Sequence, residues 1–348
     1  MGWLEPTLFW AAMTGLLALA GKRHAKVFWP LLALALLLLF NHLFTPGFFG
    51  LEWRGGHLYG SRIDILNQGA KVMLLALGMT LVIATAGVDL SVGAVMAIAG
   101  AVAAQAVASG YSFASAVAGA MAVALAAGAW NGLLVAGFGI QPIVATLILM
   151  VAGRGVAQLI TDGQIINFTD PAFVYLGNGH WLGLPFTLTL VAAMFGVTCL
   201  LTRRTALGLF IEAVGDNETA CRYAGVNARL VKFVVYVFAG LCAGLAGLVA
   251  CSNIKSADAN HAGLYLELDA ILAVVVGGTA LTGGRYYLLG SIVGALLIQA
   301  LTTTLYARNV SADIAPVPKA LVILIVCLLQ SPTLRQRVGR LMNRKGKA

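Results

Sequence analysis

The chain has 348 residues, of which 60% are hydrophobic and 10% charged, and its 22 basic and 13 acidic residues give a net charge of +9. Soluble domains are about 45–50% apolar and about 25% charged, so this composition excludes an ordinary water-soluble protein. One membrane-spanning helix takes about 20 apolar residues, and several such helices with short loops would use up the chain. The composition therefore predicts an all-α integral membrane protein with no room for a separate soluble catalytic domain.

Apolar runs separated by glycine, proline and charged clusters predict a bundle of ten transmembrane helices. In chain order they lie near residues 27–44, 63–87, 90–109, 113–137, 141–160, 184–201, 230–252, 267–283, 286–306 and 314–330. An earlier apolar stretch at 4–20 is compatible with an extra N-terminal helix that spans the membrane or lies on its surface, or with a false start. The prediction is thus an N-terminal apolar segment and basic cluster at 1–26, a transmembrane domain at 27–330 and a basic tail at 331–348.

The basic residues predict which loops face the cytoplasm. If the Lys22–Lys26 cluster is inside and the ten spans alternate, most of the 22 basic residues fall on inside segments, including the C-terminal tail. The same spread over several loops argues against nucleic-acid binding. The cysteines are scattered without a CxxC pair, so neither disulfides nor a metal site is expected.

The longest inside connection, at 202–229, contains a short predicted helix. Asp216 can cap it by accepting hydrogen bonds from the first turn, Glu218 suits the positive end of its dipole, and Gly225 is placed to end it. The helix would run over 217–224 and is too short to be stable alone, so it must pack on another surface. Two interpretations fit: an element that docks a partner protein, or a surface-lying connector.

A series of motifs carries a resemblance that covers the chain from about Ser61 to Gln330. In order they begin at Ile63-Asp-Ile-Leu-Asn67, Gly78-Met-Thr-Leu, Gly87-Val-Asp-Leu-Ser-Val-Gly93, Gln141-Pro-Ile-Val-Ala-Thr146, Arg154-Gly-Val-Ala-Gln158, Gly225-Val-Asn227, Ala257-Asp-Ala-Asn260, Glu267-Leu-Asp-Ala and Gly283-Gly-Arg285. With them the chain resembles the permease subunits of bacterial ATP-binding cassette (ABC) sugar importers of the ribose type, and is most similar to galactofuranose permeases. The resemblance implies a multi-pass protein of the inner membrane with its C-terminus in the cytoplasm.

The resemblance also implies partners and a task. The subunit would pair with a second permease subunit, either the same chain or a related one, and work with a cytoplasmic ABC ATPase and a periplasmic sugar-binding protein. It would pass a monosaccharide, galactofuranose or a related pentose or hexose, from the binding protein to the cytoplasm. The alternative considered is an ion-coupled secondary sugar transporter, which usually needs acids near mid-span, and the predicted spans place none there.

No catalytic role is expected for this chain. The loop 278–285 has the glycine spacing of a phosphate-binding loop but ends in Gly-Gly-Arg where that motif needs Gly-Lys-Ser/Thr. ATP and Mg²⁺ would therefore be bound by the partner ATPase, and no cofactor is expected here. The family's ATPase-coupling loop maps onto 212–227, which favours the docking interpretation with candidate residues Glu212, Gly215, Asp216, Asn217, Glu218, Ala220, Arg222 and Gly225.

Polar residues inside the spans are the candidates for a substrate path. A charge at mid-bilayer costs about 2.5–3.5 kcal/mol on insertion scales, so Lys71 and Arg154 are informative. Asn67, Gln68 and Lys71 share a helical face, and Arg154 and Gln158 form an i,i+4 pair. We hypothesise that these residues line the outward opening of the path, and the alternative is snorkelling or contact with the binding protein. Weaker candidates nearer the inner side are Asn131, Gln141 and Thr146.

Acidic residues at two span ends allow two interpretations each. Asp89 or Ser91 can cap the helix that follows, or Asp89 lies near an inner gate and binds sugar hydroxyls or stabilises one state of the cycle. Glu267 begins a span after the outer polar stretch 253–266, where a helix N-terminus stabilises an acid whatever its function. A contact with the binding protein is the other option for Glu267, together with Asp258 and Asn260.

Overall fold

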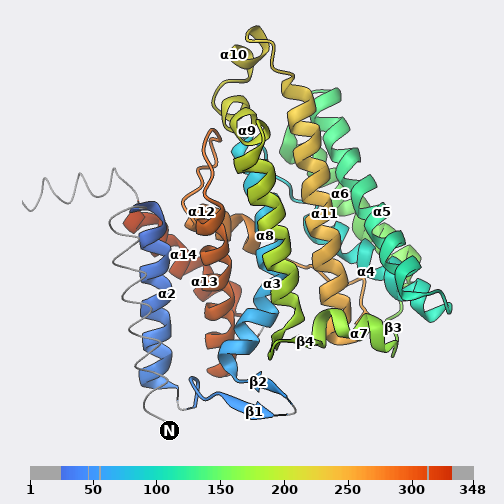
Figure 1. The fold of residues 1–348 in the computed structure, drawn as a ribbon, viewed down its shortest axis with the longest axis vertical. Coiled ribbons are helices and arrows are strands. Elements are labelled where there is room, and N and C mark those ends of the chain that lie inside the picture. Colours follow the sequence, from blue (N-terminus) through green and yellow to red (C-terminus); the bar gives the residue numbers. More distant parts are fainter. Residues whose placement is uncertain (1–24, 46, 55, 312, 331–348) are drawn as a thin grey trace, which may run out of the picture.

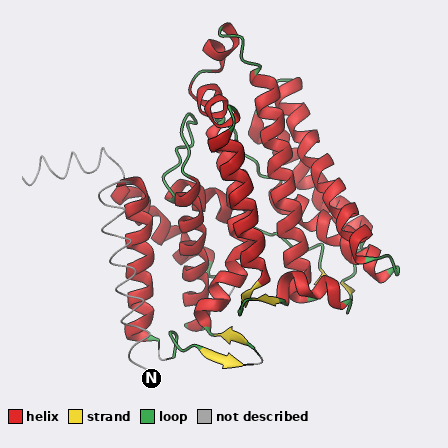
Figure 2. Ribbon diagram, in the orientation of Figure 1, coloured by secondary structure: helices red, strands yellow, loops and turns green. Residues whose placement is uncertain are grey.

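The computed structural model describes residues 25–330 except 46, 55 and 312, and in this part the protein is a bundle of α-helices (Figures 1 and 2). Three two-stranded antiparallel sheets are also present, each only two or three residues per strand. In Figure 1, α10 lies at one end of the bundle and the hairpin of β1 and β2 lies at the other. We call these the α10 end and the hairpin end.

The helices follow one another with short connections. They are α2 (Ala25–Phe44), α3 (Ser61–Ala84), α4 (Val92–Ala108), α5 (Phe113–Gly132) with the π-helical η1 (Leu133–Gly137), α6 (Pro142–Ile160), α7 (Pro171–Asn178), α8 (Phe186–Arg204), α9 (Leu207–Asp216), α10 (Glu218–Tyr223), α11 (Ala228–Ile254), α12 (Leu266–Val276), α13 (Leu288–Ala307) and α14 (Pro316–Gln330). The strands are β1 (Glu52–Arg54) with β2 (His57–Tyr59), β3 (Ile166–Asn167) with β6 (Ser256–Ala257), and β4 (His180–Trp181) with β5 (Leu184–Pro185).

The all-α class is confirmed, whereas ten full-length spans are not. Among the described residues, seven helices are long and apolar enough to cross a membrane, namely those at 27–44, 61–84, 113–137, 142–160, 186–204, 228–254 and 288–307. The other three predicted spans correspond to shorter helices: α4 has 17 residues, α12 has 11 and α14 has 15. The predicted N-terminal helix at 4–20 and the tail at 331–348 lie outside the described residues.

The predicted span at 267–283 is wrong in its second half. α12 stops at Val276 because two glycines follow, and the backbone at Gly278 has a φ of +94°, which a helix cannot continue. Gly277 also packs directly on Gly290 of α13, and a Cβ on Gly277 would lie 2.6 Å from the amide nitrogen of Ser291. The chain then forms the loop 277–287, which reaches the α10 end.

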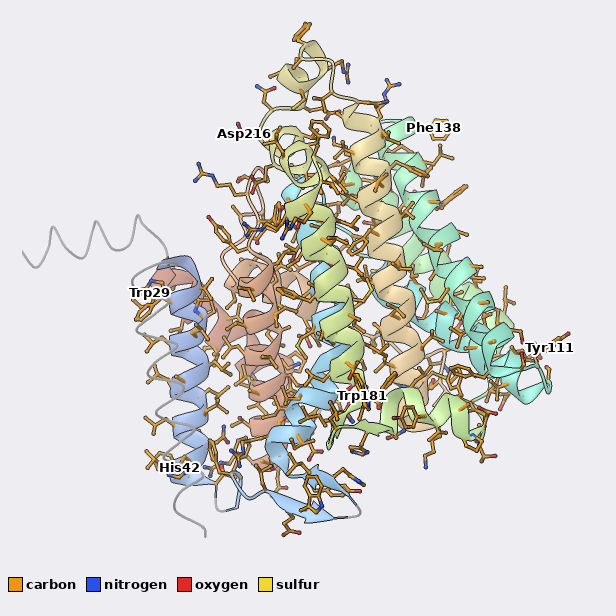
Figure 3. All side chains as sticks on the ribbon, viewed as in Figure 1. Trp29, His42, Tyr111, Phe138, Trp181 and Asp216 are labelled. Carbon is orange, nitrogen blue, oxygen red and sulfur yellow. The ribbon has the colours of Figure 1, made fainter. Side chains whose placement is uncertain are left out.

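The core of the bundle is built around α11, which packs on α3, α4 and α5. Small residues allow these backbones to approach closely, as membrane helix interfaces require. A Cβ on Gly240, for example, would lie 2.9 Å from the Cα of Gly128 in α5. Side chains of α3 from Val72 to Ala84 are almost entirely buried, so α3 is enclosed by other helices and not by lipid. Large side chains that stay exposed, such as Tyr111 and Phe138, lie on the outside of the bundle (Figure 3).

Candidate functional site

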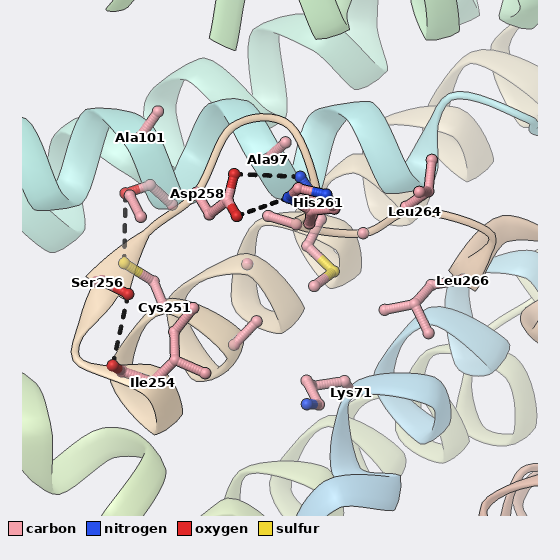
Figure 4. Close-up of a pocket in the computed structure, with 17 residues that line it drawn as sticks. Lys71, Ala97, Ala101, Cys251, Ile254, Ser256, Asp258, His261, Leu264 and Leu266 are labelled. Carbon is pink, nitrogen blue, oxygen red and sulfur yellow. Dashed lines mark hydrogen bonds and ion pairs between the residues drawn. The ribbon is translucent and has the colours of Figure 1, made fainter. Parts of the chain in front are cut away.

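A cavity of about 240 Å³ lies between α3, α4, α11 and the non-helical segment 255–265 (Figure 4). Lys71 of α3 forms one wall, and Figure 4 shows Asp258 and His261 on the opposite side. Small apolar residues of α4 and α11, including Gly100 and Cys251, line much of the remainder. The cavity is therefore mostly apolar, with charged side chains on two facing walls.

The segment 255–265 dips into the bundle from the hairpin end. α11 ends at Lys255, whose left-handed backbone (φ 55°) reverses the chain. α4 runs beside α11 in the same direction: a Cβ on Gly100 would meet the Cβ of Cys251 at 3.5 Å, and one on Gly247 would meet the Cα of Met96 at 3.1 Å. Gly93 lies one turn before Met96. It is therefore level with the residue of α11 that lies about ten positions before the end of that helix, which is roughly 15 Å inside the bundle from the hairpin end.

Gly263 reaches that same level. Its backbone has a φ of +73°, and a Cβ there would lie 2.9 Å from the carbonyl carbon of Gly93. α12 starts immediately afterwards and continues toward the α10 end, so its first turn lies inside the bundle. Irregular backbone at membrane depth is tolerated only where it is buried in protein or lines a cavity, and residues 256–258 and 261–264 of this segment line the cavity.

Arg154 and Gln158 of α6 hold the segment in place. The Arg154 Nη1 donates to the carbonyl oxygens of Ala259, at 3.0 Å, and Ala262. The Gln158 Nε2 donates to Asn260 Oδ1 at 2.7 Å. These bonds join residues that the sequence suggested for two separate roles, the substrate path and the contact with a binding protein.

Glu267 lies behind the same segment. Its side chain is buried in the first turn of α12, close enough to Arg154 for the two charges to interact, and a Cβ on Gly93 would overlap its carboxylate. In this structure Glu267 is an internal partner of the segment and not an exposed one. Asn260 is exposed and Asp258 half-buried.

The three predicted path residues of α3 point in different directions. The Lys71 Nζ donates to Gln68 Oε1 at 2.7 Å, so these two residues act together beside the cavity. Asn67 faces α8 instead, where its Oδ1 accepts a hydrogen bond from the Thr187 hydroxyl at 2.7 Å. Asn67 therefore lies on a different face of α3 from Gln68 and Lys71, and of the three only Lys71 lines the cavity.

A second polar cluster is buried at the turn between α3 and α4. Asp89 is 2% exposed, and its Oδ1 accepts hydrogen bonds from the backbone amide and the hydroxyl of Ser91, at 2.9 and 2.6 Å. Asn131 of α5 donates to the same hydroxyl at 2.7 Å. The predicted cap is wrong: Ser91 occupies the N-cap position of α4, but its side chain makes no capping hydrogen bond and binds Asp89 instead.

Tyr236 of α11 belongs to this cluster and was missed by sequence reasoning. Its phenol is fully buried, interacts electrostatically with Asp89, and finds no hydrogen-bond partner within the described residues. A Cβ on Gly87 would lie 2.7 Å from its Oη, so a larger residue at this position would crowd the phenol. The available signal was a lone tyrosine within an apolar span, which is not distinctive.

The other inner candidates lie near the start of α6. The hydroxyl of Thr146 is buried, donates to the Pro142 carbonyl at 2.9 Å and reaches the Val88 carbonyl at 3.4 Å. Thr146 therefore borders the turn that carries Asp89. Gln141 is exposed at the N-cap position and its side chain makes no capping hydrogen bond.

The short predicted helix at 217–224 exists as α10, although its cap differs from the prediction. Asn217, not Asp216, caps it: the Asn217 Oδ1 accepts from the amide of Ala220 at 2.9 Å, whereas Asp216 is the last residue of α9. Glu218 at its start binds Lys232 of α11 at 2.6 Å, and Arg222 lies 3.9 Å from the same carboxylate. The left-handed Gly225 (φ 81°) follows the helix end as expected.

The end of α9 that adjoins α10 contacts the bundle at a cluster of three glycines, Gly215, Gly283 and Gly284. A Cβ on Gly215 would overlap the carbonyl oxygen of Ala84, which ends α3, and would lie 2.6 Å from the amide nitrogen of Gly284. The Gly284 amide itself donates to that Ala84 carbonyl at 3.0 Å. We call Gly215, Ala84, Gly283 and Gly284 the glycine junction. It connects α9 and α10 to the turn that carries Asp89.

At the hairpin end, a pair of histidines joins the segment between α2 and α3 to the segment between α7 and α8. The rings of His57 in β2 and His180 in β4 stack with centroids 3.7 Å apart, and the Leu58 amide donates to the Gly183 carbonyl at 3.2 Å. Burial, followed by the neighbouring His57, lowers the pKa of His180 below its ordinary value. Tyr59 and Tyr175 also border this pair.

Comparison with known proteins gives one family match. The family described as branched-chain amino acid transport system / permease component matches residues 61–329. The galactofuranose transporter permease protein of Escherichia coli K12 is 52% identical over 308 residues, covering 87% of this chain and 90% of that protein. A fructose import permease protein of Bifidobacterium longum is 39% identical, covering 87% of each chain, and the ribose import permease protein of E. coli K12 is 37% identical, covering 90% and 97%. No solved structure matches.

Proposed function

This chain belongs to the family of branched-chain amino acid transport system permease components, and from its similarity to a galactofuranose permease we propose that it imports galactofuranose or a closely similar monosaccharide. It is the permease subunit of an ABC sugar importer, a transport component that carries neither a catalytic centre nor a cofactor. The observation that carries the choice of sugar is the 52% identity to the galactofuranose permease, against 39% and 37% for the fructose and ribose permeases.

Uptake by the reconstituted importer tests the choice of sugar. Proteoliposomes holding this chain with its ATPase and binding protein are expected to accumulate radiolabelled galactose, which supplies the furanose ring at equilibrium, only when ATP is present. Unlabelled ribose and fructose serve as competitors. Preferred uptake of ribose or fructose, with galactose excluded, would refute galactofuranose as the substrate. Uptake that persists without ATP and collapses with an uncoupler would refute ATP-driven transport.

We propose that ten helices cross the inner membrane, the seven long ones together with α4, α12 and α14. The chain then divides into the N-terminal segment 1–26, the transmembrane domain 27–330 and the tail 331–348. The α10 end faces the cytoplasm, and so does the C-terminus. This orientation is supported by the basic residues near the α10 end, because cytoplasmic loops are rich in Lys and Arg: Arg203, Arg204, Arg222, Arg229 and Lys232.

Labelling of single cysteines with an impermeant reagent tests the orientation. A cysteine at exposed Tyr223 in α10 should react only after the cells are opened. Tyr111 is exposed and follows the C-terminal end of α4, at the hairpin end of the bundle. A cysteine there should react in cells in which only the outer membrane has been made permeable. The reverse pattern would overturn the assignment.

We further propose that α9 and α10 receive the cytoplasmic ABC ATPase. The supporting observations are the exposed surface of α10, the Asn217 cap that holds it, and the glycine junction that links it to the bundle. The periplasmic sugar-binding protein is then assigned to the hairpin end, where Asn260 is exposed. A second permease subunit, the same chain or a related one, completes the importer, and mass spectrometry of the purified complex distinguishes these two cases.

The polar cluster around Asp89 is proposed as part of the inner gate. It lies at the end of α3 that carries the glycine junction, so a displacement of α9 would be transmitted to it over a few residues. Asn131 and Thr146 border the same turn from α5 and α6. A force applied by the ATPase would thus act on α3, α5 and α6 together.

A further inference from the structure

We propose that the cavity between Lys71 and the segment 255–265 is a binding station for one uncharged monosaccharide midway along the permease. The inference rests on the proposed function, because it assumes that a sugar crosses this chain. It goes beyond that function by giving the permease its own recognition site in addition to that of a binding protein. Lys71 supplies hydrogen-bond donors to the sugar, and Asp258 supplies acceptors.

The donor side of the cavity is incompletely used. An ammonium group has three donors, and Lys71 gives one of them to Gln68 at 2.7 Å. Lys71 makes no ion pair with a carboxylate of the described residues, although it lies about ten residues inside a helix of membrane length. A charge kept at such depth is expensive, and it is retained where it faces a substrate or water-filled cavity.

The acceptor side has spare capacity as well. One oxygen of Asp258 accepts from the backbone amides of Asn260 and His261, at 2.9 and 3.3 Å, and the other contacts His261 Nδ1 at 2.8 Å. A carboxylate offers about four acceptor positions, so one or more remain for a ligand. The hydrogen bonds fix the direction of the carboxylate, and Figure 4 shows it above the cavity, across from Lys71.

The remaining walls and the size select the class of ligand. Ala97, Gly100 and Ala101 of α4 and Gly247 of α11 line the cavity with small apolar groups that suit the C–H face of a sugar ring. A volume of about 240 Å³ is below the about 300–1,000 Å³ of pockets for drug-sized ligands, which favours one ring over two. An anionic sugar would meet the Asp258 carboxylate, and a cationic one would meet Lys71, so a neutral polyol fits best.

The backbone supports the same conclusion. α12 begins inside the bundle after an irregular segment, and half-helices of this kind form the midplane substrate sites of many transporters. Arg154 and Gln158 then act as positioning residues: they do not line the cavity but hold the segment that carries Asp258. Their predicted role at the path opening is replaced by an indirect one.

The first test compares charge-neutral variants in the reconstituted importer. Lys71→Met and Asp258→Asn are expected to lose about tenfold or more of the uptake efficiency for galactose, because each removes a hydrogen bond to a charged group. Lys71→Arg should recover part of it. Lys255→Met is the matched control, since this exposed lysine lies at the same end of α11 but does not line the cavity. Melting temperatures identify any variant that is merely unfolded.

The second test does not depend on transport. In a Cys251→Ala background, a cysteine introduced at Ala101 should react with a small methanethiosulfonate reagent and be protected by millimolar galactose. Glucosamine and galacturonate, which are charged, should protect less. A cysteine at Tyr111, outside the cavity, should not be protected by any of them.

The outcomes separate the two proposals. If the wild-type importer takes up no sugar with ATP, the proposed function fails. If it takes up sugar while Lys71→Met and Asp258→Asn match Lys255→Met, and galactose does not protect the cysteine at Ala101, the binding station is overturned and the function stands. Equal protection by the charged sugars would refute the selection of a neutral ligand.

Discussion

Replacement of Gly215 by alanine is the most direct test of the glycine junction. The added Cβ would overlap the Ala84 carbonyl oxygen and would lie 2.6 Å from the Gly284 nitrogen. To restore an ordinary separation of 3.4 Å from that nitrogen alone, α9 must move by about 0.8 Å relative to the loop 277–287. The hydrogen bond from Gly284 to Ala84 runs through the same point, so the movement also stretches or breaks it.

The magnitude follows from these contacts. Overpacking of this kind costs about 1–3 kcal/mol, and loss of the hydrogen bond adds about 0.5–1.5 kcal/mol. The better helix propensity of alanine offsets about 1 kcal/mol, which leaves a net cost of about 0.5–3.5 kcal/mol. Native stabilities are about 5–15 kcal/mol, so the variant should fold and insert with its junction displaced. Because the junction is proposed to transmit the ATPase stroke, the variant should hydrolyse more ATP for each sugar imported.

The assay measures sugar uptake and ATP hydrolysis in the same proteoliposomes, with melting temperature in detergent as the measure of stability. Gly196→Ala is the matched control: Gly196 lies within α8, and a Cβ there would have no atom within 4 Å. We expect Gly196→Ala to keep the wild-type ratio of ATP to sugar and to melt at the same or a higher temperature. A Gly215→Ala variant with wild-type melting temperature and wild-type ratio would refute both the contact and its role.

Three further predictions concern surfaces outside the membrane. Asn217→Ala should remove the N-cap of α10, which is worth about 0.5–2 kcal/mol, and should therefore retain less ATPase on purification. Asn217→Asp keeps a capping oxygen and should retain the ATPase. Equal ATPase recovery with both variants would contradict the docking role. The Glu218–Lys232 ion pair is partly exposed, so a double-mutant cycle should give a coupling free energy of at most about 1 kcal/mol, and this energy should decrease as salt is added. A larger or salt-independent coupling energy would contradict a partly exposed ion pair. His180 has a folded-state pKa below its ordinary value of about 6.5, so its contribution to stability is complete above that pH and is lost as the pH falls through the lowered pKa. Melting temperature should therefore fall between pH 7.5 and 5.5, and less steeply in His180→Gln; parallel pH profiles would refute a role for this histidine.

The helical plan was largely readable from the sequence because spans are set by local composition. Apolar runs, glycine breaks and basic clusters act within a stretch of about 20 residues, and the resulting boundaries of α2, α6, α8 and α13 agree within a few residues. The prediction of a span at 267–283 was wrong in its second half, because the apolar composition of this stretch does not show that Gly277 and Gly278 form a turn packed against α13. Local sequence also predicted the position of α10 but not its N-cap residue. Both Asp216 and Asn217 are favourable N-cap residues, and Asn217 caps α10 because α9 ends at Asp216.

Composition alone thus determined that the protein is an all-α membrane protein, and the motifs determined its family. The cavity could not be found in this way, because it joins Lys71 to Asp258 across 187 positions of the chain and depends on the depth of an irregular segment. The sequence identified Arg154 as costly in a bilayer, whereas only the tertiary structure shows that its guanidinium donates to two backbone carbonyls. The physical reason is that hydropathy and helical period are local properties, while the pairing of a buried polar group is decided by whichever distant backbone comes to lie beside it.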